Sequence, residues 1–454
     1  MIELFRRYKA INKLFSRESE FDLAYLHGRG IEFFPQIKNS KVSVFEGGVI
    51  SCYRFFREVI NNLFLSKTDD HKADVVFFSN TVNQYNTTCD IYEELVNQGV
   101  SCAKIATRNI NRNVDYVKLK LSDLVLVLFF LLKRGGKIYW KLNHLSNNRF
   151  NIKYLFFYWV SYFYCVNFYR YLYKKDIKLL VMSNDHNVEN RVLRLICEDL
   201  GIETLYIQHA TSPGNLPPLN FDYAFLDGLN AFNDYLISQG GTPVSKKTKI
   251  YLSGIIKRLS QPMIKSNVIV GVAMNSYDDL DSVAEFINRL GVYRQGCIIR
   301  AHPAQRKEDM QKLSNLGVEI SYGSTEPVND FFDKISVLIG GNSSIHIEAA
   351  SSGIATLYKE FGESTIPSDY YSFVKNGVSL ANYEDISVEK DISISLRNKD
   401  SKSRVDSISQ YNASYLTSWK NNEYRLVSES ILCIINNLPM KHFIASDDYY
   451  VIAK

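Results

Sequence analysis

Apolar runs of strand length alternate with stretches of helical spacing through the first half of the chain. The strand-like runs lie at residues 74–80, 101–106, 177–182, 202–208, 221–226 and 249–252. One helical stretch between them ends at Gly99, and another, at 188–200, ends at Gly201. Glycine commonly terminates helices, and parallel strands covered by helices produce this alternation. The pattern therefore predicts βαβ units in this half.

The alternation is more regular after a polar, proline-bearing stretch at residues 260–266, which we interpret as a hinge. Strands are predicted at 268–272, 297–301, 318–322, 337–341 and 355–358. Helices are predicted between them at 281–290, 305–316, 328–333 and 344–352. Such doubly wound sheets bind ligands at the carboxyl ends of their strands, so the loops after the strands are of most interest.

The predicted fold class is α/β, with two Rossmann-like domains facing each other across a cleft. The expected divisions are an N-terminal domain with an N-terminal extension at 1–260, a C-terminal domain at 261–385, and a helical segment at 386–454. A length of 454 residues agrees with two domains, because one hydrophobic core seldom serves so long a chain.

Several segments fall outside this alternation. Residues 1–70 combine basic amphipathic pieces with a strand-like run at 41–45, and residues 390–404 are polar before a helical stretch at 427–438. The apolar run at 124–132 is too short to span a membrane and is expected to be a buried helix or strand. The aromatic segment at 154–173 has two interpretations, a core helix or an aromatic face on a bilayer interface.

Composition narrows the classes of function. The net charge of +5 is compatible with anionic ligands or a membrane surface but too small for a protein that coats nucleic acid. The seven cysteines are scattered, without metal-binding spacing, which indicates a reducing compartment. No secretory signal is recognisable at the first residues, so we expect a cytoplasmic protein, with the inner face of the cytoplasmic membrane as an open alternative.

The candidate ligand-binding residues of the second half lie in two loops. His302-Pro303 follows the strand that contains Arg300, and an imidazole at an expected helix N-terminus can donate to a phosphate. The second loop opens the helix at 344–352 with two glycines, an amide, two hydroxyls and then a carboxylate. Its residues are Gly340, Gly341, Asn342, Ser343, Ser344 and Glu348. We expect an anion cradle in which Glu348 binds ribose hydroxyls, the alternative being an ordinary glycine turn with serine caps.

The first half carries the candidates for proton transfer. Asp185 and His209 each follow a predicted strand, and either one is a candidate general base that faces a donor across the cleft. A helix cap for Asp185 and a satisfied buried histidine for His209 are the alternatives. Further ligand candidates at strand ends are Asn184, Asp227, Ser253 and Gly254. No P-loop and no metalloprotease or serine-hydrolase motif is recognised. A D-x-D pattern occurs within Asp278-Asp279-Leu280-Asp281, but we expect it to lie in a polar loop at a helix start, and therefore expect no obligatory metal or cofactor.

These motifs, in this order, resemble bacterial GT-B glycosyltransferases of surface-polysaccharide synthesis. The similarity runs from about residue 178 to 360 and includes the sialyl- and Kdo-transferring capsule enzymes and the CDP-glycerol glycerophosphotransferases. The matching residues are Tyr206-Ile207-Gln208-His209, Leu252-Ser253-Gly254, Arg300-Ala301-His302-Pro303, Gly341-Asn342-Ser343-Ser344, Glu348-Ala349 and Gly353. Two positions depart from the pattern: Ala210 replaces a glycine of the polyol-phosphate transferases, and Leu226 replaces the first acid of the sialyltransferase motif.

The resemblance implies that the C-terminal domain holds a nucleotide-activated donor and the N-terminal domain an acceptor. For the donor site it implies Ser253, Gly254, Arg300, His302, Pro303, Gly341, Asn342, Ser343, Ser344 and Glu348, and for the acceptor site Asn184 and Asp227. A CMP-linked sugar is the expected donor and a glycan or lipid-linked glycan the acceptor. A polyol-phosphate transferase, an epimerase-like enzyme and a non-catalytic assembly factor remain alternatives.

Overall fold

The computed structural model describes residues 2–26, 29–30, 44–65, 72–145, 155–212, 216, 218–238, 248–260, 267–362, 367–381 and 388–453. Residues 261–266 of the expected hinge, 41–43 of the strand-like run and parts of the 211–218 loop lie outside these ranges. Residues 44 and 45 begin a helix, so a strand is the wrong prediction there.

The N-terminal domain contains a nine-stranded sheet in the order β16-β17-β9-β8-β7-β6-β3-β4-β5. The strands are β3 (Val75–Phe78), β4 (Cys102–Ala106), β5 (Asp115–Tyr116), β6 (Leu179–Met182), β7 (Glu203–Ile207), β8 (Tyr223–Leu226), β9 (Lys249–Leu252), β16 (Phe443–Ala445) and β17 (Tyr450–Ile452). Every pair is parallel except β16 with β17. The runs predicted from the sequence are therefore confirmed as strands of one sheet.

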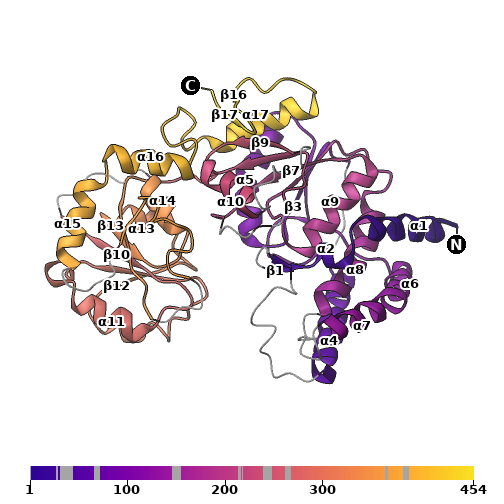
Figure 1. Ribbon diagram of the computed structural model, residues 1–454, viewed down its shortest axis with the longest axis horizontal. Coiled ribbons are helices and arrows are strands. Elements are labelled where there is room, and N and C mark those ends of the chain that lie inside the picture. The colour runs from indigo at the N-terminus through magenta and orange to yellow at the C-terminus, as the bar shows by residue number, and fades with distance from the viewer. Residues whose placement is uncertain are drawn as a thin grey trace.

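The C-terminal domain contains a six-stranded, wholly parallel sheet in the order β12-β11-β10-β13-β14-β15. Its strands are β10 (Val270–Ala273), β11 (Ile298–Ala301), β12 (Glu319–Tyr322), β13 (Val337–Gly340), β14 (Ala355–Tyr358) and β15 (Leu380–Ala381). Its helices are α11 (Leu280–Asn288), η4 (Gly291–Tyr293), α12 (Gln311–Ser314), α13 (Val328–Phe332) and α14 (Ile345–Ser351). Figure 1 shows the two sheets in separate domains, and the predicted α/β class is confirmed.

Local sequence accounts for where the helices beside the N-terminal sheet begin and end. Helix α5 (Val82–Asn97) starts where the Thr81 side chain accepts a hydrogen bond from the Gln84 backbone, which caps the first turn. Helix α9 (Val188–Leu200) ends at Gly201, whose φ of +73° is the left-handed cap that glycine favours. Helix α10 (Leu229–Ser238) follows β8. Because β6, β7 and β8 are parallel, the loops that follow them lie on the same edge of the sheet.

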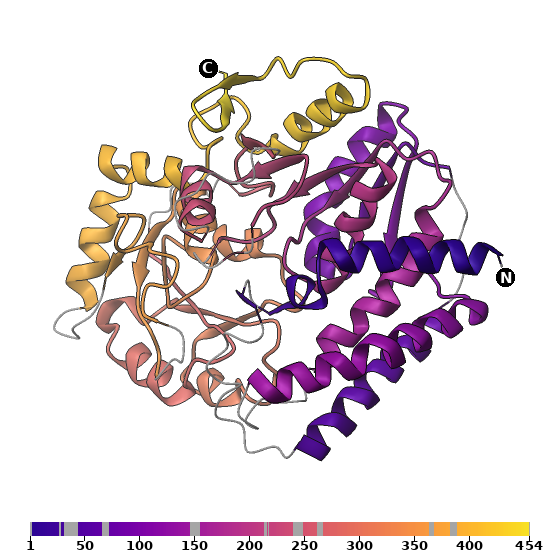
Figure 2. The ribbon, with the colours of Figure 1, turned by 45° about the vertical axis from the view of Figure 1, so that its right-hand side comes forward.

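A helical unit covers one side of the N-terminal sheet. It comprises α1 (Ile2–Arg17), α2 (Glu20–Leu23), α4 (Val44–Leu63), α6 (Leu121–Phe130), the π-helical turn η2 (Leu131–Gly135), α7 (Gly136–Leu145) and α8 (Leu155–Leu172), with the short ladder of β1 (Tyr25–Leu26) and β2 (Arg29–Gly30) nearby. Figure 2 shows α4, α7 and α8 as long helices on the flank of the domain.

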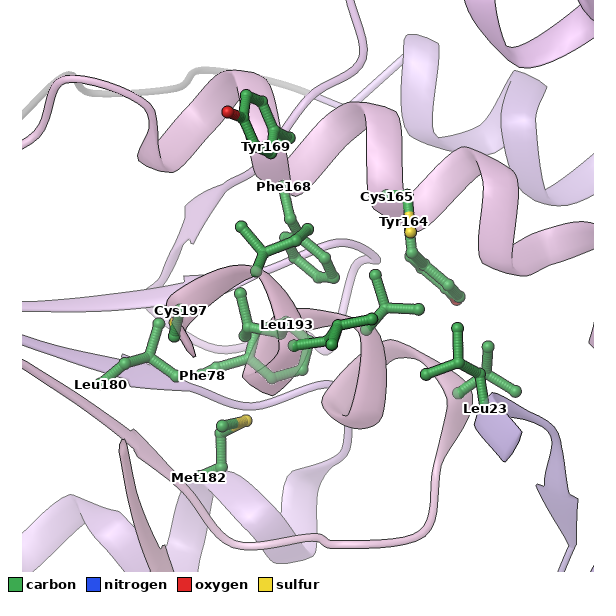
Figure 3. Close-up of a cluster of buried hydrophobic side chains, with 14 of the residues drawn as sticks. Leu23, Phe78, Tyr164, Cys165, Phe168, Tyr169, Leu180, Met182, Leu193 and Cys197 are labelled. Carbon is green, nitrogen blue, oxygen red and sulfur yellow. The ribbon is translucent and has the colours of Figure 1, made fainter. Parts of the chain in front are cut away.

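The aromatic segment at 154–173 is the central helix of this unit. Tyr158, Tyr162, Phe163, Tyr164 and Phe168 of α8 are all fully or almost fully buried. Figure 3 shows side chains of α8 reaching toward α9 and the strands beneath it. The core-helix interpretation is therefore confirmed, and the alternative of an aromatic face on a bilayer is wrong for this segment.

Residues after 385 divide between the two domains. Helices α15 (Val388–Asn398) and α16 (Lys402–Tyr411) occupy the stretch that looked merely polar; one side of each is buried, α15 against the C-terminal sheet. Helix α17 (Glu423–Ile435) packs on α5, and β17 pairs with β9. Figure 1 shows this last part of the chain crossing back over the N-terminal domain.

Candidate functional site

A small pocket, with a cavity volume of about 20 Å³, lies between the two domains. Its walls come from α5, the carboxyl ends of β7 and β8, the segment after β9, and the start of α14. The lining residues are Thr87, Gln208, His209, Ala210, Thr211, Asp227, Ile255, Ile256, Lys257, Ser344, Ile347 and Glu348. Carboxyl ends of β7 and β8 thus meet the start of α14 at one cavity, and strand ends are where parallel sheets of this kind bind ligands.

An ion pair crosses the pocket from the interdomain segment to the C-terminal domain. Lys257 Nζ donates to Glu348 Oε1 at 2.5 Å, with side chains 43% and 9% exposed. Burial lowers the pKa of Lys257, but the negative charges of Glu348 and Asp227 outweigh burial and raise the pKa overall. A positive charge is therefore held at the pocket wall, and one oxygen of Glu348 is already engaged.

The carboxyl of Asp227 faces this pocket from the end of β8. Its backbone N–H donates to Gln208 Oε1 at 2.9 Å, which links the ends of β7 and β8. Burial raises the pKa of Asp227 well above its usual range, Lys257 opposes the rise, and Glu348 and Glu423 add to it. A carboxyl with a raised pKa can accept or hold a proton near neutral pH.

His209, at the end of β7, also lines the pocket. Burial lowers the pKa of its imidazole to about 4, against a smaller opposing effect of Asp185. Its Nδ1 is buried and has no hydrogen-bond partner among the described residues. The ring is therefore neutral at neutral pH, and its Nδ1 is placed where it could accept a hydrogen bond from a bound group.

On the C-terminal sheet, His302 follows β11 in a turn. The helix expected to begin at Pro303 is wrong: residues 302–310 form turns, and α12 starts only at Gln311. The Gln305 side chain accepts from the His302 backbone N–H at 2.7 Å, and Nδ1 of His302 accepts from the Ala304 N–H at 3.2 Å. Burial also lowers the pKa of His302. In the neutral ring the proton therefore sits on Nε2, which can donate to a ligand.

In the glycine and serine loop after β13, Asn342 holds the local structure together and Ser344 lines the pocket. Asn342 is fully used within the protein: its Nδ2 donates to Glu360 and to the Pro367 carbonyl, and its Oδ1 accepts from the Tyr370 N–H. Ser344 lines the pocket, and its side chain makes no cap hydrogen bond to α14. Gly341 and Ser343 lie beside it and are not among the pocket-lining residues.

The two phosphate-binding loops predicted from the sequence are not on adjacent strands. Strand β10 lies between β11, which leads to His302, and β13, which leads to Ser343 and Ser344. Neighbouring strands are about 4.8 Å apart, so the loops start about 10 Å from each other. A ligand would have to extend across the end of β10 to contact both.

Three other residues expected at the donor site serve the packing of the protein. Arg300 donates to Ser321 Oγ and to the Glu326 carbonyl, both at 2.9 Å. Ser253 is buried and its Oγ lies 3.4 Å from the Leu226 carbonyl. Gly254 has a φ of +89°, and a Cβ there would lie 2.2 Å from Ser414 Oγ. Donor binding by these three residues remains a prediction without support from their contacts.

Asp185, expected to be a general base, and Asn184, expected at the acceptor site, do not line the pocket. The Asp185 carboxylate is bonded to His186 Nδ1 at 2.9 Å and accepts from the Tyr235 hydroxyl at 2.6 Å. Burial favours a higher pKa for Asp185, but these hydrogen bonds and the charge of His186 hold it below the usual range. Asn184 Oδ1 accepts from the backbone N–H groups of His186 and Asn187. Both side chains therefore shape the start of α9.

Some pocket residues carry no recognisable signal in the sequence. Lys257 lies outside any motif, and Thr87 is one of many polar residues on a helix. Gln208 stands in a motif, yet only the strand pairing shows that its amide bridges to Asp227 and to the Ala210 carbonyl. Among the described residues, no group of three or more histidine, cysteine or acidic side chains is arranged to hold a metal ion.

Comparison with known proteins gives only distant structural similarity. No family model and no curated protein matches the sequence. The solved structure of CalG4, the calicheamicin glycosyltransferase, is 9% identical with a TM-score of 0.49, covering 81% of this chain and 99% of its own. UDP-GlcNAc 2-epimerase from Neisseria meningitidis bound to UDP-GlcNAc is 15% identical with a TM-score of 0.47, covering 79% and 99%. MurG of Acinetobacter baumannii is 10% identical with a TM-score of 0.45, covering 79% and 99%. Similarity this distant carries no argument about activity or ligands.

Proposed function

We propose that the protein is a glycosyltransferase that moves a sugar from a nucleotide-activated donor to a hydroxyl group by direct displacement. The observation that carries the proposal is the interdomain pocket, in which Asp227 and His209 from one domain face Ser344 and Glu348 from the other. A transferase needs its proton acceptor and its leaving-group contacts on opposite sides of the reacting atom. This arrangement meets that requirement.

In this proposal, Asp227 is the general base. Its carboxyl lines the pocket, and burial raises its pKa, which makes it a stronger proton acceptor than an ordinary aspartate. The Asp185 carboxylate, by contrast, is already held by His186 and Tyr235. The acceptor oxygen attacks the anomeric carbon as its proton passes to Asp227. The bond from that carbon to the donor phosphate breaks, and its electron pair leaves with the phosphate.

The leaving nucleotide is assigned to the carboxyl edge of the C-terminal sheet, where it would extend across the end of β10 to reach both loops. His302 has a proton on Nε2 available for donation, and the hydroxyl of Ser344 makes no cap bond to its own helix. Ser343 and Gly341 stand next to Ser344 in the same loop. Lys257, beside Glu348, adds a positive charge that favours a developing anion.

His209 is assigned to hydrogen bonding rather than to proton transfer. Its unpaired Nδ1 can accept from a hydroxyl of donor or acceptor without further desolvation. The sequence resemblance favours a CMP-linked donor and a glycan or lipid-linked glycan acceptor. A single displacement would invert the configuration at the sugar carbon.

Parallel calorimetric titrations with CMP, CDP, UDP and GDP test the donor side of this proposal. One nucleotide should bind at least ten-fold more tightly than the others, and His302→Ala should weaken that binding while the fold stays intact. Binding of none of the four would contradict a nucleotide-activated donor. Incubation of the matching sugar donor without acceptor separates the epimerase alternative, since only an epimerase would release isomerised sugar.

A further inference from the structure

The helical unit of the N-terminal domain carries a concentration of exposed apolar side chains. Ten of the twenty large apolar residues that are exposed in the described parts of the chain lie on α1, α4 and α6 to α7, and an eleventh, Phe64, directly follows α4. Isolated exposed apolar residues are ordinary, whereas a contiguous set indicates a contact surface. None of them lines the interdomain pocket, so the pocket does not explain them.

Five of these residues form a stripe along α6, η2 and α7, which we term the α6–α7 stripe. It consists of Leu121, Val125, Phe129, Leu132 and Trp140, with exposed fractions of 73%, 65%, 47%, 83% and 69%. Steps of three or four residues, or twice four, return to the same face of a helix. The stripe therefore runs along one face of a continuous helical segment.

Aromatic contacts extend the stripe onto α1. The rings of Tyr8 and Phe129 have centroids 5.3 Å apart, and those of Phe5 and Tyr8 are 6.5 Å apart. Phe5 is itself 56% exposed. The apolar surface is thus shared by two helices, which Figure 1 shows at the end of the domain remote from the C-terminal sheet.

The charges around the stripe are positive. Lys133 Nζ lies over the rings of Tyr8 and Phe129, Lys9 lies over Phe5, and Lys137 is exposed. Among the described side chains of residues 121–140, the single acid is Asp123, which is fully buried and paired with Arg7 and Arg170. On α1 the exposed Glu3 stands two residues before Phe5, but residues 121–140 carry exposed lysines and no exposed acid, which makes this apolar stripe complementary to an anionic lipid surface.

The same buried charges hold the stripe in place. Asp123 Oδ1 lies 2.7 Å from Arg7 on α1, and Asp123 Oδ2 lies 2.8 Å from Arg170 on α8. Helix α6 is thereby fixed to the core helix, so its exposed face is presented without rearrangement. Among the described residues, no helix is long and apolar enough to cross a membrane.

We propose that the α6–α7 stripe, with Phe5, Lys9, Lys133 and Lys137, docks the protein on the surface of an anionic phospholipid bilayer. The helices lie flat, with Leu132 and Trp140 inserted among the acyl chains near the headgroups and the lysines at the phosphates. This surface is independent of the chemistry of the pocket. Docking on a bilayer would also explain why these apolar side chains of α1, α6, η2 and α7 are exposed rather than buried.

A second stripe lies on α4 of the same unit. Val49, Tyr53, Phe56, Ile60 and Phe64 are 53%, 63%, 42%, 47% and 83% exposed at steps of three or four residues. Arg57 lies over the Tyr53 ring, with 5.7 Å between its guanidinium carbon and the centroid. Figure 2 shows α4 on the same flank of the domain as α7.

Flotation of the full-length protein with vesicles tests the proposal. Vesicles of phosphatidylglycerol and phosphatidylethanolamine should bind the protein, phosphatidylcholine vesicles should bind it at least ten-fold less, and added salt should weaken binding. The double variant Leu132→Glu/Trp140→Glu should lose at least ten-fold in binding. A matched control, Ile237→Glu/Val292→Glu, changes two side chains of similar exposure, 70% and 77%, and should bind as the unmodified protein does.

Absence of binding to anionic vesicles by the unmodified protein would overturn the proposal, as would equal losses in the two double variants. If light scattering shows a dimer that Leu132→Glu/Trp140→Glu abolishes, and vesicles do not bind, the stripe is a contact between copies and the proposal fails. Should the glutamate variant not fold, brominated lipids provide a second measurement. They should quench the tryptophan fluorescence of the unmodified protein and not that of Trp140→Phe, and unchanged quenching in Trp140→Phe would equally overturn the proposal.

Discussion

Lys257 and Glu348 join the two domains of the protein through an ion pair whose Nζ and Oε1 atoms lie 2.5 Å apart. Lys257 belongs to the segment that follows β9, and Glu348 to the first turns of α14. Asp227 is close enough for its charge to affect the pKa of Lys257. The contact between the domains is therefore electrostatically coupled to the proposed general base.

Replacing either partner of this pair should destabilise the protein by about 1–2 kcal/mol, a range reduced from that of a fully buried pair because Lys257 is 43% exposed. Lys257→Met leaves a nearly buried carboxylate without its partner. In the double variant Lys257→Met/Glu348→Gln, the loss should be smaller than the sum of the single losses. Denaturant unfolding of the four proteins measures this coupling, and strict additivity would show that the pair contributes nothing.

His302→Ala should reduce donor affinity or turnover by about 10- to 100-fold, the usual range for one hydrogen bond to a charged group. His302→Gln retains a side-chain donor and should recover part of the loss. Thermal unfolding should change little in both variants, since His302 is only partly buried in a surface turn. Equal activity of His302→Ala and the unmodified protein would remove His302 from the donor site.

Gly254→Ala should destabilise the protein by about 2 kcal/mol or more. The new Cβ would lie 2.2 Å from Ser414 Oγ, in addition to the strain of a φ of +89°. Gly201→Ala is the matched control, because Gly201 has a φ of +73° and no atom within 4 Å of its added Cβ. Its cost should be only about 1 kcal/mol. Equal losses in the two variants would mean that the packing against Ser414 is unimportant.

The fully buried His346 should make the protein less stable in acid. Burial lowers the pKa of its ring from 6.5 to about 4 in the folded state. Between these values the unfolded chain binds a proton that the folded protein does not, so the free energy of unfolding falls as the pH drops from 6.5 toward 4. The full loss is about 3 kcal/mol.

Denaturant unfolding at pH 7.5, 5.5 and 4.5 checks this dependence. Other groups also titrate in this range, among them His209, so the comparison must be with His346→Gln. That variant should lose part of its stability at pH 7.5, because the bonds of His346 to the Gly340 carbonyl and to Ser379 are altered. Its stability should then fall less with acid. Parallel curves for the two proteins would exclude His346 as the titrating group.

The sequence predicts the strands well because buried parallel strands are short apolar runs with glycine or polar residues at their ends. It is less informative where local patterns and tertiary contacts compete. The predicted helix at 305–316 shortens to Gln311–Ser314, because Gln305 closes a turn on His302. The polar stretch after residue 385 forms helices because one side of each packs against the protein.

The candidate site is only partly predictable for a related reason. Motifs identified His209, Asp227, Ser344 and Glu348, which do line one pocket. The order of the strands in a sheet cannot be deduced from the sequence alone. The sequence therefore does not reveal that β10 lies between β11 and β13, the strands that lead to the two candidate phosphate-binding loops. Asp185 also looked suitable as a base, but a hydroxyl fifty residues away, on Tyr235, binds its carboxylate.

The most direct test of the account is turnover of a panel of nucleotide-activated sugars, including CMP-, CDP-, UDP- and GDP-linked donors, by the unmodified protein and by Asp227→Asn. The account predicts transfer from one donor class by the unmodified protein. It also predicts that Asp227→Asn still binds the nucleotide but is at least 100-fold slower, as is usual when a general base is lost. Absence of turnover with every donor, or a normal rate for Asp227→Asn, would contradict it.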